Sequence, residues 1–184
     1  MHRQPVLDLL RRHRPADERE RAMWQQTIAF VETHPDCFER SLAVGESMPG
    51  HITGSAWIIS PDRTQVVLIH HRKLDRWLQP GGHADGNPDV AQVALREAQE
   101  ETGLPDLQLI SPEIFDVDVH EIPARGNEPT HLHYDIRFAF SGDSKTFSVN
   151  RQETKDIRWV SLGDVEDYTD DESVLRLKRK SKGL

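Results

Sequence analysis

The sequence predicts an α/β protein with an N-terminal helical segment, and three observations lead to that prediction. Runs rich in β-branched and aromatic residues begin after Pro49-Gly50. One stretch with clear helix start and stop signals lies between these runs. Before Pro49, apolar residues recur instead at helical spacing. The 184 residues are enough for one compact core with a small appended segment.

Residues 1–48 are predicted to be an N-terminal segment of two helices, the second of which ends near His34-Pro35. Neither helix carries a set of catalytic residue types. We expect their apolar stripes to pack either on the main domain or on a second copy of the chain, and the latter alternative predicts a homodimer. The stripe of the first helix is Val6, Leu7, Leu9 and Leu10, and that of the second is Met23, Trp24, Ile28 and Val31.

Residues 49–184 are predicted to be the main domain, built on a β-sheet. Gly54–Ser60 and Gln65–His70 flank Pro61-Asp62-Arg63, which favours a turn, so a hairpin is expected. The long polar loop 121–130 is of the kind that borders a site. Four further runs have the composition of strands: Leu107–Ile110, Ile114–Val119, Tyr134–Phe140 and Ile157–Val160.

Composition and charge exclude several classes of protein. No stretch approaches the ~20 apolar residues of a membrane helix, and the N-terminus lacks the apolar centre of a signal peptide. The single Cys37 cannot form an internal disulfide and suits a reducing compartment, so we expect a cytoplasmic protein without a membrane partner. The net charge of −8 argues against a nucleic-acid partner held by clustered Lys and Arg. An acidic protein that handles phosphates must recruit cations, which points to a metal.

Two short basic runs, Arg11–Arg14 and Arg176–Lys182, do not change that expectation. The second lies late in a helix predicted from about Asp171 to Lys180, where positive charge interacts favourably with the helix dipole. We expect both runs to be solvated helix ends.

The helix that interrupts the strands is predicted over Pro88–Thr102. Asn87 is a good N-cap residue, and Pro88 suits the first helical position. Gly103 favours the left-handed conformation that ends a helix, and Pro105 prevents the helix from resuming.

This helix brings three carboxylates to one edge. At ~100° per residue, Glu97 and Glu101 lie ~40° apart and Glu100 lies ~60° to the other side of Glu97. Like charges at this spacing repel, and the C-terminal half of a helix disfavours negative charge. A solvated acidic face is the plainer alternative, but divalent cations would offset the repulsion, and Mg²⁺ prefers oxygen ligands. The apolar stripe beside this edge is expected to pack on the sheet: Val90, Ala91, Ala94, Leu95 and Ala98.

The residues around these glutamates resemble the signature of a known family. Gly82, Arg96-Glu97, Glu100-Glu101 and Gly103-Leu104 match the Nudix box, GX5EX7REUXEEXGU, in register over 23 positions. Residues 50 to 170 also resemble the family's catalytic domain in the order of their elements. The resemblance to Nudix hydrolases implies an α/β/α sandwich around a mixed sheet. One position departs from the pattern, because Pro88 stands where the box has a glutamate.

The resemblance also implies roles for residues. Glu97, Glu100 and Glu101, with the backbone carbonyl of Gly81, would hold Mg²⁺ or Mn²⁺. Arg96 would orient the glutamates by charge-assisted hydrogen bonds. Clustered metal ions suit phosphoanhydride hydrolysis, because they neutralise phosphate charge and help to deprotonate water.

The family often takes a general base from outside the box. Glu153, just before the predicted strand Ile157–Val160, is the preferred candidate. Glu121 and Glu128, in the long loop, are the alternatives.

Three histidines, His83, His131 and His133, are expected either to contact substrate or to be structural. His131 and His133 would lie on one side of a strand. A His-x-His pair also suggests zinc, but no third soft ligand has suitable spacing and Cys37 is remote. Trp57 and Trp77 are more typical of a core or a pocket wall than of base-stacking platforms.

We therefore expect a metal-dependent pyrophosphohydrolase acting on a small nucleotide, a nucleoside diphosphate linked to another group. Nucleoside diphosphate sugars or ADP-ribose are favoured, because the N-terminal extension resembles that of dimeric sugar-nucleotide Nudix enzymes. One alternative is a MutT-like triphosphate pyrophosphatase. Two others are an isopentenyl-diphosphate isomerase, which needs a cysteine in the site, and a silent nucleotide sensor.

Overall fold

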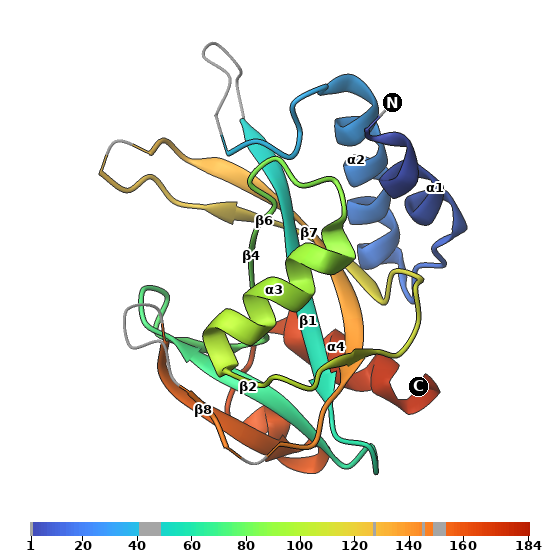
Figure 1. Cartoon of the computed structure of the whole chain (residues 1–184). Coiled ribbons are helices and arrows are strands. Elements are labelled where there is room, and N and C mark those ends of the chain that lie inside the picture. Colours follow the sequence, from blue (N-terminus) through green and yellow to red (C-terminus); the bar gives the residue numbers. More distant parts are fainter. Residues whose placement is uncertain (1, 41–48, 127, 145, 149–153) are drawn as a thin grey trace.

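The computed structural model describes residues 2–40, 49–126, 128–144, 146–148 and 154–184 (Figure 1). It confirms the α/β class and the mixed sheet expected from the sequence. Among the described residues, no helix has the length and apolar character needed to cross a membrane. The helices are α1 (Gln4–Arg12), α2 (Glu18–Thr33), α3 (Val90–Thr102) and α4 (Glu172–Lys180), with short 3-10 turns at Leu162–Asp167 and Ser181–Gly183. The strands are β1 (Gly50–Ile59), β2 (Gln65–His71), β3 (Arg76–Leu78), β4 (Gly81–His83), β5 (Gln108–Leu109), β6 (Asp116–Ile122), β7 (His131–Ser141) and β8 (Thr154–Ser161).

The sheet is built around the parallel pair of β1 and β7, the two longest strands. They pair from Gly50 with Leu132 to Ile59 with Ser141. The strand order is β3-β2-β1-β7-β5, with β4 paired to β1, β6 to β7 and β8 to β2. These other pairings are antiparallel, and the predicted hairpin of β1 and β2 is among them.

Alternate residues of β1 pack on opposite sides of the sheet, because successive side chains of a strand point in opposite directions. Ala56 and Ile58 share a core with Val93 of α3, whereas Trp57 and Ile59 share another with Leu177 of α4. Figure 1 accordingly shows α3 in front of β1 and α4 behind it. Helix α3 comes close at Gly54, where a Cβ atom would lie 2.9 Å from the Val90 carbonyl oxygen.

The two N-terminal helices pack on the sheet of their own chain. Val6 and Val31 are buried in the core that α3 also covers. The rings of Phe30 on α2 and Tyr134 on β7 stack with centroids 3.9 Å apart. Of the two surfaces expected for the helical stripes, the main domain is therefore the one observed, while the homodimer stays a prediction.

Helix α3 begins at Val90, two residues later than the sequence predicts. The Asn87 side-chain oxygen accepts a hydrogen bond from the Asp89 N–H at 3.0 Å, so Asn87 forms a local turn instead of a cap. Asp89 is the N-cap, and its side chain accepts from the Gln92 N–H at 3.1 Å. The predicted end is confirmed, since Gly103 has a φ of 71°.

The expectation that Arg176–Lys182 is a solvated helix end is wrong for Arg176. Its guanidinium is buried between α4 and the sheet, 2.8 Å and 2.9 Å from the two Asp116 carboxylate oxygens and 3.0 Å from Asp118. Lys180 lies 2.6 Å from the buried Glu20 of α2 and 3.0 Å from Asp116. The dipole argument fails here because the side of α4 that carries Arg176 packs on buried carboxylates of the sheet.

Candidate active site at the Gly81-Gly82 loop and helix α3

The glycines of β4 lie directly against two glutamates of α3. The Gly81 N–H donates a hydrogen bond of 2.9 Å to Glu101 Oε2. A Cβ atom on Gly82 would lie only 2.3 Å from Glu97 Oε2. Strand β4 is held there by pairing with β1, where Gly82 lies opposite Gly54. The loop thus brings its backbone to both carboxylates, and at Gly82 the approach of Glu97 leaves no room for a Cβ atom.

Arg96 ties the same loop to Glu97. One guanidinium nitrogen, Nη2, donates to Glu97 Oε1 at 2.6 Å and to the His83 carbonyl oxygen at 2.9 Å. The first is a charge-assisted hydrogen bond, and both partners are partly shielded from water. This geometry is the one an orienting arginine needs; its role in catalysis stays a prediction.

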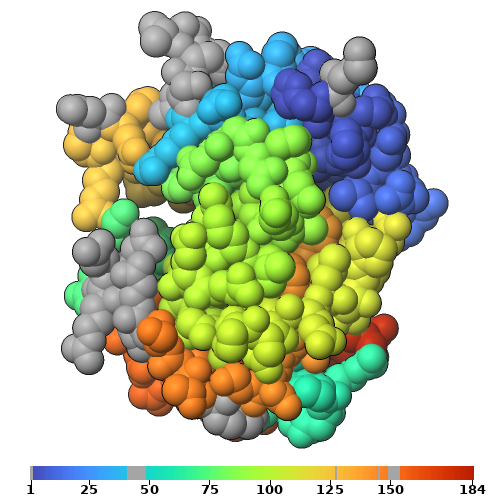
Figure 2. Space-filling model, in the orientation of Figure 1, coloured from blue at the N-terminus to red at the C-terminus, as the bar shows by residue number. Residues whose placement is uncertain are grey.

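The three glutamates differ in their exposure to solvent. Glu101 is buried, Glu97 is intermediate and Glu100 is exposed on the outer side of α3. Figure 2 shows this outer side across the middle of one face of the molecule. The donors are hard carboxylate oxygens beside a loop that a Cβ atom would block, so the residues fit a hard divalent cation such as Mg²⁺.

The proposed general base, Glu153, lies outside the described residues. Of the alternatives, Glu121 is exposed at the end of β6, and Glu128 is 3.0 Å from the Arg40 guanidinium. Pro88, at the box position that normally holds a glutamate, precedes the cap Asp89 and lies outside α3.

The three histidines expected at the site lie together on the other side of the sheet from α3. His131 and His133 of β7 have ring centroids 5.2 Å apart, which confirms that they share one side of the strand. The His83 ring lies 5.1 Å from that of His133. Burial, first of all, lowers the pKa of His83 to about 4, and it also lowers the pKa of His133 well below its usual range.

Sequence reasoning missed a fourth histidine, His51, whose ring centroid lies 4.8 to 5.1 Å from those of the other three. It is fully buried, and burial lowers its pKa to about 3. His51 is the second residue of β1 and pairs with His133. The two are 82 residues apart in sequence, so only the parallel pairing of β1 and β7 reveals their contact.

The tryptophans behave as expected. Trp57 is fully buried and donates from its indole nitrogen to Ser181 Oγ at 2.7 Å. Trp77 lines a cavity of about 330 Å³ together with Tyr168.

Comparison with known proteins decides the family. A family model described as NUDIX domain matches residues 51–178, well over half of the chain. The chain belongs to the Nudix family. The fold of this Nudix chain agrees, because it superposes on a Nudix-family hydrolase from Clostridium perfringens with a TM-score of 0.52 and 22% identity, over 72% of this chain and 96% of that one.

Relatives with known names differ in what those names say they act on. A Mycobacterium tuberculosis protein, provisionally named 8-oxo-dGTP diphosphatase 3, is 34% identical over 58% of this chain and 49% of its own length. The asymmetrical bis(5'-nucleosyl)-tetraphosphatase of Rattus norvegicus is 33% identical over 51% of this chain and 58% of its own. The chain thus spans about half the length of these relatives. The Nudix domain of Shewanella oneidensis NrtR, solved with ADP ribose, shares the fold at 16% identity, with a TM-score of 0.51 over 84% of this chain and 96% of that one.

Cys37, the single cysteine, gives the isomerase alternative no support. It is buried in the core that includes the N-terminal helices, and burial raises the pKa of its thiol to about 11. A thiol in this state is inert.

Proposed function

We propose that this Nudix chain is a metal-dependent pyrophosphohydrolase that cleaves a nucleoside diphosphate linked to another group. The observation that carries the proposal is the contact of one loop with two box glutamates, through the Gly81 N–H and the bare Gly82 backbone. A solvated acidic face would not need a glycine loop fitted against it. Family membership supports the reaction class.

The metal ligands in this proposal are the carboxylates of Glu97, Glu100 and Glu101 with the Gly81 carbonyl. Mg²⁺ is the preferred ion and Mn²⁺ the substitute. A divalent cation held there neutralises phosphate charge and lowers the pKa of water.

The other roles belong to the chain's own residues. Arg96 keeps the Glu97 carboxylate turned towards the loop, and Glu101 fixes the loop through Gly81. Glu153 is proposed to take the proton from the attacking water. The products are a nucleoside monophosphate and a phosphorylated partner.

The proposed substrates are nucleoside diphosphate sugars or ADP-ribose. The support is the N-terminal helical segment, which resembles the extension of sugar-nucleotide Nudix enzymes. Substrate contact by His83, His131 and His133 stays a prediction without support of this kind, because these residues lie across the sheet from α3. A second candidate, a nucleoside triphosphate pyrophosphatase, is favoured by the name of the M. tuberculosis relative. The name of the rat relative fits the first candidate in that its substrate joins two nucleosides through a phosphate chain.

A substrate panel tests both candidates. The full chain is incubated with Mg²⁺ and ADP-ribose, UDP-glucose, a dinucleoside tetraphosphate, dGTP or 8-oxo-dGTP, and the products are separated by ion-exchange chromatography. Release of a nucleoside monophosphate from the first two compounds is expected. Turnover of triphosphates alone would reject the first candidate in favour of the second.

The variant Glu100→Gln tests the metal ligands, because it keeps the size of an exposed side chain and removes its charge. It is expected to abolish turnover without changing the melting temperature. Turnover that persists in a Glu100→Gln, Glu101→Gln double variant contradicts the mechanism, and the absence of any turnover in the wild type would favour a nucleotide sensor.

A further inference from the structure

The histidine cluster lies on the face of the sheet opposite to the box glutamates. On β1, Gly54 faces α3, whereas Thr53 and Ser55 face the other way and donate to Asp135 at 3.0 and 2.8 Å. His51 is in phase with Thr53 and Ser55 and therefore shares their face. The cluster is thus a separate group of ligand-type side chains, not an extension of the carboxylate edge.

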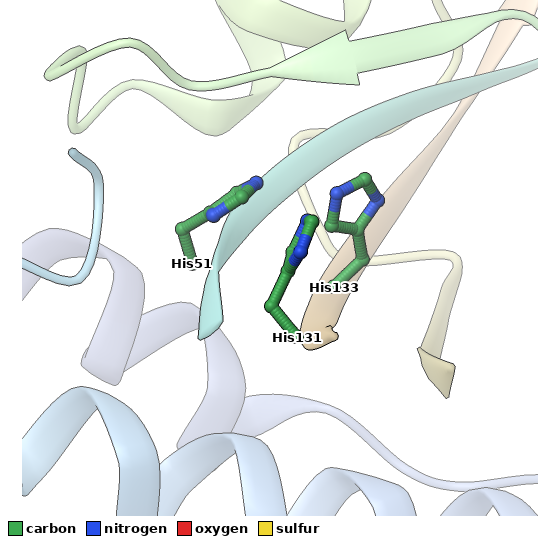
Figure 3. Close-up of side chains that lie close together, drawn as sticks. All are labelled: His51, His131 and His133. Atoms are coloured by element: carbon green, nitrogen blue, oxygen red, sulfur yellow. The ribbon is translucent and has the colours of Figure 1, made fainter. Parts of the chain in front are cut away.

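Three of these histidines have ring nitrogens close enough to share one ion. His51, His131 and His133 each offer a nitrogen, and the three atoms all lie within 4.8 Å of one another. Figure 3 shows the three rings gathered between β1, which carries His51, and the start of β7, which carries the other two. Among the residues that the structure describes, no other set of three ligand-type side chains meets this condition.

Three ring nitrogens of the cluster lack hydrogen-bond partners from the described part of the chain. Both nitrogens of His51, which is 1% exposed, are buried and unpaired, and so is Nε2 of His133. An imidazole buried without partners loses its hydration and gains nothing in return, so such groups need an explanation. A ligand that accepts nitrogen lone pairs supplies one.

A hydrogen bond to the backbone orients the His131 ring for such a ligand. His131 Nδ1 lies 2.8 Å from the Pro129 carbonyl oxygen, which can only accept a hydrogen bond. In the neutral ring this contact places the proton on Nδ1 and leaves the lone pair on Nε2. Metal-binding histidines almost always have an outer hydrogen bond of this kind.

We propose that His51, His131 and His133 bind a divalent transition-metal ion of the zinc type, at a site distinct from the magnesium ligands of the box. Imidazole nitrogen suits zinc, copper, iron and nickel, whereas Mg²⁺ prefers oxygen. Three protein ligands leave the fourth tetrahedral position open, as in catalytic rather than structural zinc sites. The His83 ring borders the cluster, with its centroid 4.9 Å from that of His51.

Cobalt titration of the full chain tests the site directly. The protein is freed of metal with a chelator, supplied with excess Mg²⁺ to fill hard oxygen sites, and titrated with Co²⁺. The expected result is one equivalent bound, with the strong visible d–d bands of four-coordinate cobalt, and loss of these bands when Zn²⁺ is added. A titration that shows only the weak bands of six-coordinate cobalt would overturn the proposal.

Two ligand variants and one control locate the site. His51→Phe replaces an unpaired buried ring by an apolar ring of similar size, and His133→Gln removes a less buried ligand. If one of these variants fails to fold, the other still gives a result. Each is expected to lose the bands and to weaken cobalt binding at least about ten-fold. His34→Gln, on the C-cap of α2, is expected to bind as the wild type does. Unchanged bands in a folded ligand variant contradict the assignment.

A last variant separates this proposal from the proposed function. Glu100→Gln is expected to keep the cobalt bands while losing hydrolysis. If the bands fail to form in an active wild type, the histidine site is wrong and the hydrolase assignment stands. If the bands form in a chain without turnover on any substrate, the histidine site stands and the hydrolase assignment is wrong.

Discussion

Glu101 of α3 accepts a hydrogen bond of 2.9 Å from the backbone N–H of Gly81, a residue 20 positions earlier in the chain. The contact fixes the distance between the glycine loop and the acidic edge of the helix. Because carboxylate and loop are held by the same bond, a change in either one is expected to move both.

Gly82→Ala is expected to lower turnover about 100-fold, because misplacement of a reacting group by ~1 Å has effects of this size. The new methyl group would overlap Glu97 Oε2, which is 2.3 Å from that position. The Glu97 side chain can turn away, so the melting temperature should change little. Steady-state kinetics and thermal melts check both points. Gly183→Ala is the control, since nothing lies within 4 Å of a Cβ atom there.

Arg96→Ala is expected to reduce kcat more than KM. The side chain holds Glu97 and the His83 carbonyl at 2.6 and 2.9 Å, and its loss removes the hydrogen bond that turns the Glu97 carboxylate towards the loop. Arg96→Lys should restore only part of kcat, since an ammonium group lacks the planar fork of a guanidinium. Arg21→Ala, which removes an exposed arginine of α2, is the matched control. Equal kcat in the wild type and Arg96→Ala would mean that Arg96 does not orient the site.

Asp116→Ala is expected to destabilise the protein by about 3–5 kcal/mol, because it leaves buried positive charge unpaired. Asp116 is fully buried and contacts both Arg137 and Arg176. Breaking the exposed pair of Arg11 and Glu32 instead should change the free energy of unfolding by about 1 kcal/mol or less. Urea unfolding of the two variants measures the difference, and similar values for both would contradict the structural role of the buried network.

Acid is expected to destabilise the protein partly through Glu20. Burial acts to raise the pKa of this carboxyl, but hydrogen bonds from His13, the Ala16 N–H and Lys180 outweigh it and hold the pKa far below 4.5. A lowered pKa contributes stability that is fully present above 4.5 and is lost progressively as the pH falls below that value.

Glu20→Gln tests this pH dependence, because the amide cannot titrate. At pH 7 the variant should be less stable than the wild type, and the difference should shrink as the pH falls below 4.5. Urea unfolding of both proteins between pH 7 and acid pH measures this difference in the free energy of unfolding. Curves that stay parallel would show that Glu20 has no part in the acid sensitivity.

The sequence by itself determined the α/β class, the box helix α3 and the resemblance to the Nudix family, but it did not predict the short strands β3 and β4. The start and stop signals predicted the helix, and the spacing of Glu97, Glu100 and Glu101 predicted its acidic edge, because 3.6 residues per turn fix which side chains share an edge. The end of α3 at Gly103 was also predictable, since glycine adopts the left-handed conformation without strain. The beginning at Val90 was not, because Asn87 and Asp89 are both good caps and the choice depends on which amide each one meets.

Only the tertiary structure decided what lies across the sheet from α3. His51 and His133 become neighbours through the parallel pairing of β1 and β7, and Arg176 becomes buried because α4 packs on Asp116. Periodicity within a segment tells which face a side chain occupies, but not which other segment faces it. The spacing of residues within one helix was therefore enough to predict the carboxylate edge, because all three glutamates lie on that helix. The histidine cluster and the buried charge network needed the fold, because each is assembled from segments far apart in the chain.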